Sequence, residues 1–219
     1  MVNNEAVWLG KALQGDPQAF TELVEAYQRP VFNLCYRMTG NAQDAEDAAQ
    51  ETFLRAYQNL NRYDRSRPFS TWLLSIAAHY CIDQARKRRH PVVAIEELPV
   101  PDLPEPGPGM ETQLSRKQEQ QRVRGLLDRL DPLDRAAVVL YYWYDFSYDE
   151  ICQSLSLSLS AVKSRLHRAR RLMAETWQQQ GTPDGEPAQP AGRQPAAAAV
   201  PPAEHRAHTD RLLLERMAP

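Results

Sequence analysis

The chain is poor in cysteine and glycine and contains no long apolar run. Its three cysteines, Cys35, Cys81 and Cys152, form no CxxC pair, which favours a reduced cytoplasmic protein over a disulfide scaffold. Nine glycines in 219 residues form neither GxGxxG nor GxxxxGK[ST], so we expect no glycine-rich nucleotide loop. No apolar stretch approaches the ~20 residues of a membrane-spanning helix. The N-terminal sequence MVNNEAVWLGKALQGD does not resemble a secretory signal. We therefore expect a cytoplasmic protein without membrane insertion.

Charge is nearly balanced over the whole chain but strongly segregated along it. The 26 Lys and Arg residues and 28 Asp and Glu residues give a net charge of −2. Among charged residues, 41–51 hold only acids, 86–89 only bases and 158–174 only bases. Local charge decides where a polyanion can bind. The near-neutral total therefore does not exclude a nucleic-acid partner.

Composition divides the chain into two blocks, a linker and a tail. Residues 1–90 and 114–177 carry apolar side chains at helical spacing, which predicts an all-α protein with two small helical domains. Between them, residues 91–113 hold six prolines and five acids but no base, so we expect an extended, Pro-rich linker. Residues 178–219 are rich in Pro and Ala, which predicts a disordered tail.

The first block predicts three helices with identifiable ends. An Asp-Pro pair at 16–17 marks the start of the first, Pro30 is expected to break or kink it, and Gly40 to end it. Asn41 can cap the second helix, which places its acids opposite an apolar side. The apolar side consists of Ala45, Ala49, Phe53, Ala56 and Leu60. The third helix is expected over about 70–88.

The second block contains the pattern of a helix-turn-helix. Ser147 and Glu150 match a capping box, and after a break at 156–158 a basic helix starts near Ser158 or Ser160. Its expected buried seam is Leu159, Val162, Leu166, Ala169 and Met173. Its outward side chains are Lys163, Ser164, His167, Arg168 and Arg171. Such a helix fits the major groove, where Arg and Lys reach guanine edges or phosphates. The alternative is a solvated basic face on a surface helix.

A second candidate for nucleic-acid binding lies in the first block. Aromatic residues alternate there with bases: Tyr63, Phe69, Trp72 and Tyr80 with Arg62, Arg65, Arg67 and the basic run 86–89. Aromatic rings beside basic side chains suit unpaired nucleotides, because the nucleobases stack on the rings while Arg and Lys hold the phosphate backbone. The alternative is that Phe69 and Trp72 belong to the core, as we expect for Trp72.

Three ordered segments resemble the extracytoplasmic-function (ECF) sigma factors of the sigma-70 family. They are DAEDAAQETFLRAYQNLNRYD, PFSTWLLSIAAHYCIDQARKRR and LDRLDPLDRAAVVLYYWYDFSYDEICQSLSLSLSAVKSRLHRARRLM, and the likeness covers about residues 6–177. It implies that 1–90 is sigma region 2, that 114–177 is region 4, and that the linker threads the polymerase cleft. It further implies a bacterial, non-enzymatic factor without a cofactor. Such a factor binds core RNA polymerase and directs initiation by reading the −35 and −10 elements.

The resemblance also implies three sets of site residues. The residues expected to dock on the β′ clamp helices of polymerase are Asp44, Asp47, Gln50 and Glu51. The residues expected to contact the −10 element are Tyr63, Phe69, His79, Asp83, Gln84, Arg86 and Lys87, and segment 63–69 is the loop that takes a flipped base. His79 stands where many members carry Asn. The residues expected to contact the −35 element are Lys163, Ser164, His167, Arg168 and Arg171. Further partners implied are the β flap and a cognate anti-sigma factor.

Other classes of protein fit the sequence less well. A helix-turn-helix regulator without polymerase affinity would need neither the acidic helix nor the aromatic and basic segment. A recombinase-like enzyme would need a nucleophile or metal cluster that the sequence does not offer. The carboxylates of Asp44 and Asp47 have no nearby His for acid–base work. The spacing of Cys35, His79 and Cys81 matches no standard zinc finger. We expect buried free thiols, no catalytic residue and no metal.

Overall fold

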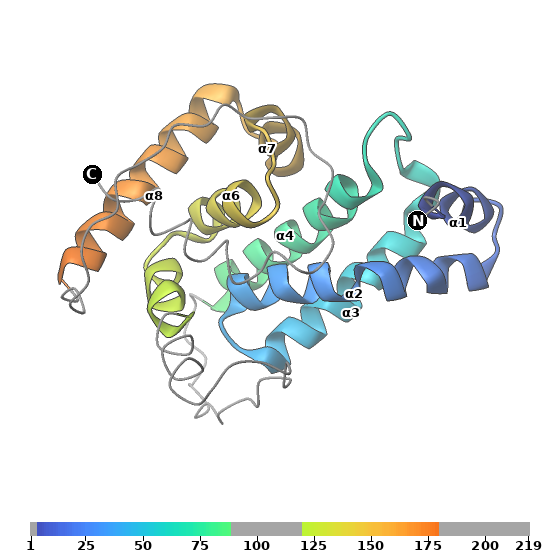
Figure 1. Ribbon diagram of the computed structural model, residues 1–219, viewed down its shortest axis with the longest axis horizontal. Coiled ribbons are helices and arrows are strands. Elements are labelled where there is room, and N and C mark those ends of the chain that lie inside the picture. Colours follow the sequence, from blue (N-terminus) through green and yellow to red (C-terminus); the bar gives the residue numbers. More distant parts are fainter. Residues whose placement is uncertain (1–3, 89–119, 180–219) are drawn as a thin grey trace. The chain divides into compact units, whose positions relative to one another are not determined.

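The computed structural model describes residues 4–88 and 120–179, and those residues form helices without any β-strand (Figure 1). The chain divides into two compact units, residues 1–94 and 95–219. The prediction of an all-α protein with two helical domains is confirmed. The predicted linker, 91–113, and nearly all of the predicted tail lie outside the described residues.

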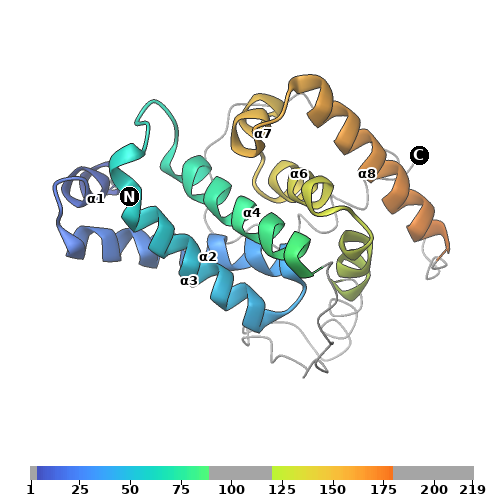
Figure 2. The same cartoon turned by 180° about the vertical axis from the view of Figure 1, so that it is seen from behind.

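The first unit is a bundle built around one long helix. Its elements are α1 (Glu5–Ala12), α2 (Pro17–Thr39), α3 (Ala42–Gln58), the 3-10 helix η1 (Leu60–Arg62) and α4 (Phe69–Arg88). α2 packs against α1, α3 and α4, and α3 also packs against α4 (Figure 2). Leu23, Val31, Leu34, Leu73 and Leu74 are fully buried. Burial of these side chains fixes the outward faces of α3 and α4.

Three of the predicted helix ends in this unit are confirmed, and Pro30 does not break the helix that contains it. The Asp16 carboxylate accepts the backbone N–H of Gln18 at 2.9 Å, Gly40 ends α2 at φ 82°, and Asn41 Oδ1 accepts the N–H of Asp44 at 2.7 Å. Pro30 does not end α2, which continues to Thr39. An interior proline costs about 3 kcal/mol, and the buried face that follows it offsets that cost through packing.

The predicted apolar side of α3 lies largely in the core. Ala45, Ala49, Ala56 and Leu60 are buried, whereas Phe53 is half-buried. Small alanine side chains let α3 approach α2 and α4 closely. The same packing turns the acids of α3 toward the surface.

The second unit contains the predicted helix-turn-helix. A helix whose described part covers 120–128 precedes α6 (Pro132–Trp143), α7 (Tyr148–Leu155) and α8 (Leu159–Gln179). The last three pack against one another around a buried core. Its largest fully buried side chains are Leu126, Leu140, Ile151, Leu166 and Met173. α8 extends two residues into the predicted tail.

Serines form the start of α7 and two of the three positions of the turn between α7 and α8. Ser147 Oγ accepts the N–H of Glu150 at 3.2 Å while the Glu150 carboxylate accepts the N–H of Ser147 at 2.8 Å, so the predicted capping box is confirmed. Ser156 takes the left-handed conformation, φ 54°, where glycine is more usual. Ser158 Oγ accepts the N–H of Ala161 at 3.3 Å. Leu159 was predicted in the buried seam but is 43% exposed, because it occupies the first position of α8 ahead of the packed turn.

Candidate functional site

The outward face of α3 carries the four residues predicted to dock on polymerase. Asp47 and Gln50 are exposed, and Asp44 and Glu51 are partly exposed. One turn beyond Gln50 the face continues into Leu54, a large apolar side chain that is half exposed. Sequence reasoning missed Leu54, although an apolar residue off the buried seam of an amphipathic helix is a usable signal. The face is therefore acidic at one end and apolar at the other.

Two of the three acids among these residues already have basic partners within the unit. Glu51 Oε1 lies 2.7 Å from Arg55 Nε, and the Arg55 guanidinium also lies 4.8 Å from the ring centre of Tyr80. Asp44 accepts a hydrogen bond from Arg88 of α4. That bond holds the pKa of Asp44 below its usual range and raises the pKa of Arg88. The acidic face is thus partly neutralised from within the chain.

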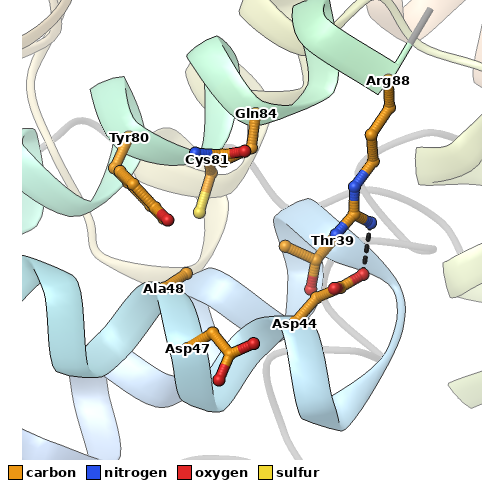
Figure 3. Close-up of a pocket in the computed structure, with 8 residues that line it drawn as sticks. All are labelled: Thr39, Asp44, Asp47, Ala48, Tyr80, Cys81, Gln84 and Arg88. Carbon is orange, nitrogen blue, oxygen red and sulfur yellow. Dashed lines mark hydrogen bonds and ion pairs between the residues drawn. The ribbon is translucent and has the colours of Figure 1, made fainter.

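A small polar cavity of about 130 Å³ separates α3 from the C-terminal half of α4 (Figure 3). Its lining is Thr39, Asp44, Asp47, Ala48, Tyr80, Cys81, Gln84 and Arg88. Gln84 was predicted with the −10 residues, but its side chain lines this cavity, beside the docking acids. Cys81 and Cys35 are buried free thiols. Among the described residues, no group of three possible ligands that could hold a metal is found.

The remaining predicted −10 residues of α4 form one exposed strip. His79, Asp83, Arg86 and Lys87 follow helical spacing and are all exposed. The Nδ1 atom of His79 lies 2.9 Å from the carbonyl oxygen of Ser75. Because a carbonyl oxygen only accepts, Nδ1 carries the hydrogen and Nε2 is left for an external partner. The strip presents two bases, one acid and one imidazole to solvent.

The two aromatic residues predicted to contact an unpaired base are instead part of the core. Phe69 is 1% exposed and Tyr63 is 9% exposed. Their rings pack together at 5.6 Å between centres, with Trp72 at 5.3 Å from Tyr63 and Tyr27 at 5.5 Å from Phe69. Ring faces used in this way are not available to stack on a nucleotide. The rings pack together because burying large aromatic area is favourable, and a role of Tyr63 and Phe69 at the −10 element stays a prediction.

The loop above this aromatic cluster is exposed and internally braced. The Tyr63 hydroxyl donates to the carbonyl oxygen of Arg67, and the Asp64 carboxylate accepts the N–H of Ser66 at 2.9 Å. The Arg67 guanidinium lies 3.7 Å from the Asp64 carboxylate. Arg65 is exposed at the tip. Segment 64–67 therefore presents polar and basic side chains to solvent and is supported by the packed aromatic cluster.

The basic face of α8 is exposed as predicted. Lys163, Ser164, His167, Arg168 and Arg171 all reach solvent. Lys163, His167 and Arg171 are successive i, i+4 positions and share one line along the helix. Arg171 Nε lies 3.5 Å from Glu175 at the exposed surface. This helix provides a stripe of donors suited to phosphates and base edges.

One member of this basic face is also tied to a buried acid. Asp134 in the first turn of α6 is 4% exposed, and it accepts Arg165 Nη1 at 2.6 Å and Arg168 Nη2 at 2.8 Å. Arg168 Nε lies 3.0 Å from the same carboxylate, while 55% of the Arg168 side chain remains exposed. Sequence reasoning missed Asp134 and Arg165. An acid in a first helical turn is ordinary, so nothing in the local pattern indicated a link between helices.

Comparison with known proteins identifies both units. Sigma-70 region 2 matches residues 23–90, and Sigma-70, region 4 matches residues 120–173. The ECF RNA polymerase sigma factor SigW of Bacillus subtilis is 38% identical over 173 residues, covering 73% of this chain and 89% of SigW. SigE of Mycolicibacterium smegmatis is 34% identical over 159 residues, covering 72% of this chain and 61% of SigE.

Solved structures share the fold. The CnrH chain solved with the cytosolic domain of CnrY superposes with a TM-score of 0.61 at 24% identity, covering 82% of this chain and 100% of CnrH. RpoE of Bartonella quintana, solved with the anti-sigma factor NepR, gives a TM-score of 0.57 at 21% identity, covering 73% and 96%. Fold and motifs together define a two-domain helical transcription factor. More narrowly, the chain belongs to the ECF subfamily of the sigma-70 family of RNA polymerase sigma factors. It is a sigma factor and not a regulator that lacks polymerase binding.

No helix in the described part of the chain is long and apolar enough to cross a lipid bilayer.

Proposed function

We propose that the chain docks on core RNA polymerase through α3 and holds promoter DNA through α4 and α8. It acts as a non-enzymatic initiation factor in the bacterial cytoplasm, with no cofactor. The observation that carries this proposal is that an exposed acidic face and an exposed basic face stand on separate helical units. An acidic face suits a protein surface of opposite charge, and a basic face suits the phosphate backbone.

The docking surface is the outward face of α3. Asp47 and Gln50 are its most accessible polar residues, and Leu54 supplies an apolar contact beside them. The expected partner is the pair of β′ clamp helices. Opposite charge would steer the encounter, while Leu54 adds buried apolar area to the complex.

The −10 surface combines the α4 strip with loop 64–67. Arg86 and Lys87 supply charge for the backbone, and His79 offers Nε2 to a base edge. Tyr63 and Phe69 support the loop from beneath, in place of the contact role expected for them. A flipped base costs a few kcal/mol of unstacking, so a braced loop that loses little freedom on binding suits this task.

The −35 surface is the exposed stripe of α8. Lys163, Ser164 and His167 are placed for base edges and phosphates, with Arg171 one turn further on. Arg168 keeps part of its guanidinium in solvent while Asp134 fixes the rest. We assign it a phosphate contact with a preset orientation.

Domain limits follow the same division. We propose residues 1–90 as region 2, 114–177 as region 4, 91–113 as the acidic linker and 178–219 as the tail. The family matches at 23–90 and 120–173 lie within the ranges proposed for region 2 and region 4. We propose the β flap and an anti-sigma factor as further partners. The solved complex of RpoE with NepR supports the second.

Charge reversal on α3 tests the docking surface. We expect Asp47→Arg with Glu51→Arg to weaken core-polymerase binding by at least about tenfold, because like charges then face each other across the interface. Affinity is measured by fluorescence titration with core polymerase, and helix content by circular dichroism. The matched control is Glu25→Arg, an exposed acid on α2, which should leave affinity unchanged.

Run-off transcription completes the test. The wild-type chain should confer start-site selection on sigma-free core polymerase, and the double variant should lose it in proportion to its core affinity. Unchanged core binding by the double variant would exclude α3 as the docking surface. Failure of the wild-type chain to direct any start site would overturn the proposed function.

A further inference from the structure

Arg88 departs from the pattern of its neighbours at the end of α4. Arg86 and Lys87 are exposed on the DNA-facing strip, but the Arg88 side chain turns toward α3 and donates to Asp44 (Figure 3). It reaches one end of the cavity described above and is the one base among the eight lining residues. A single ion pair therefore joins the proposed docking helix to the proposed DNA-binding helix.

The cavity has the chemistry of a site for a cation. Asp44 and Asp47 supply carboxylates, and Tyr80 and Gln84 add polar groups on the α4 side. The Asp44 carboxylate accepts a hydrogen bond from Arg88, which is direct evidence that a guanidinium fits there. The lowered pKa of Asp44 and the raised pKa of Arg88 agree with a favourable pair.

We propose that this cavity receives an Arg or Lys side chain of the docked polymerase, and that Arg88 occupies the site in the free chain. The proposal rests on the assignment of α3 as the polymerase-docking surface. The incoming base replaces Arg88 at Asp44, and Arg88 then joins Arg86 and Lys87 in holding promoter phosphates. Polymerase docking and DNA binding by α4 consequently strengthen each other, as linkage requires.

The position of the pair makes such an exchange inexpensive. The Arg88 side chain is 55% exposed and Asp44 is 21% exposed, and ion pairs at such positions contribute little to stability. Arg88 ends α4, so its side chain can swing away without disturbing buried residues. Replacing one cation by another leaves the charge of the carboxylate balanced throughout.

Arg88→Gln in the full chain tests the competition. Removing the internal cation should raise affinity for core polymerase about two- to fivefold, the range expected for losing an exposed ion pair. The gain should disappear at high salt, because screening weakens the attraction of Arg88 for Asp44 in the wild-type chain and so removes its advantage over a polymerase side chain. The matched control is Arg29→Gln, an exposed arginine on α2. It makes the same change in charge and should give no gain.

A double-mutant cycle with Asp44→Asn completes the experiment. Asp44→Asn should weaken core binding, and in that background Arg88→Gln should bring no further gain. Asp44→Asn should also raise the affinity of the free chain for a fluorescent oligothymidylate, because Arg88 is released. Unchanged or weaker core binding by Arg88→Gln, with a wild-type chain that does bind core, would overturn the proposal and leave the proposed function standing. Unchanged oligothymidylate binding by Asp44→Asn would overturn the release of Arg88. A wild-type chain that fails to bind core would overturn both.

Discussion

Two of the three proposed binding helices, α3 and α8, anchor their charges in opposite ways. On α3 the acids pair with bases at the surface: Asp44 with Arg88 and Glu51 with Arg55. On α8, Arg165 and Arg168 converge on the buried carboxylate of Asp134. The first arrangement leaves both partners near water, whereas the second places one partner in the core.

This difference determines which contacts can be exchanged when a partner binds. An exposed ion pair is worth about 0–1 kcal/mol, so a competing charge can replace it. Breaking a buried pair costs about 3–5 kcal/mol, because an unpaired charge remains inside the protein. The acids of α3 are therefore suited to changing partners. The Asp134 link is suited to holding α8 in a fixed orientation, while side chains outside the link contact DNA.

The largest effect is expected at Asp134. Asp134→Ala leaves Arg165 and Arg168 without their shared acceptor, and it should lower the free energy of unfolding by about 2–3 kcal/mol. This value lies below the usual cost of breaking a buried pair because the Arg168 side chain is half exposed. Urea denaturation gives the change in stability, and hydrogen exchange of the full chain shows whether protection is lost in α6 to α8.

The control for this prediction is an exposed pair in the same unit. Glu175 lies 3.5 Å from Arg171, and both side chains are more than half exposed, so Glu175→Ala should cost less than about 1 kcal/mol. If the two variants were equally stable, the contrast between a buried anchor and a surface pair would be lost.

An intermediate effect separates two bases of α8. Lys163→Ala should lower the slope of log affinity for promoter DNA against log salt concentration by about 0.9, the value for one lost phosphate contact. It should leave amide protection unchanged. Arg168→Ala should lower the slope similarly but also reduce protection in α6, because Asp134 then keeps one of its two partners. Equal exchange patterns in both variants would show that the Arg168 link does not hold α8.

Features set by neighbouring residues could be predicted from the sequence. The caps at Asp16, Asn41 and Ser147 and the stop at Gly40 each depend on a few adjacent residues. The outward acids of α3 and bases of α8 follow from helical spacing alone. These local rules gave the helices, the helix-turn-helix and the polarity of both candidate surfaces.

Features set by packing between helices could not be predicted. Pro30 lies within a continuous helix because tertiary contacts outweigh its local penalty. Phe69 belongs to the core because three other rings surround it, and no local pattern distinguishes that role from stacking on a base. The pairs of Asp134 with Arg168 and Asp44 with Arg88 join residues 34 and 44 positions apart. Such pairs depend on how the helices pack, which spacing within one helix does not reveal.

The smallest effect concerns the acid stability of the first unit. Arg88 lowers the pKa of Asp44 in the folded chain, so the pair stabilises the fold above the unfolded carboxyl value of about 3.9. That contribution is lost as pH falls through the lowered folded value, where Asp44 takes up a proton. Wild type should exceed Asp44→Asn in stability by at most about 1 kcal/mol at neutral pH. The difference should shrink below about pH 4, as urea unfolding at a series of pH values would measure. A gap that stays constant down to pH 2 would mean that the exposed pair contributes no charge-dependent stability, and the contrast with Asp134 would then rest on burial alone.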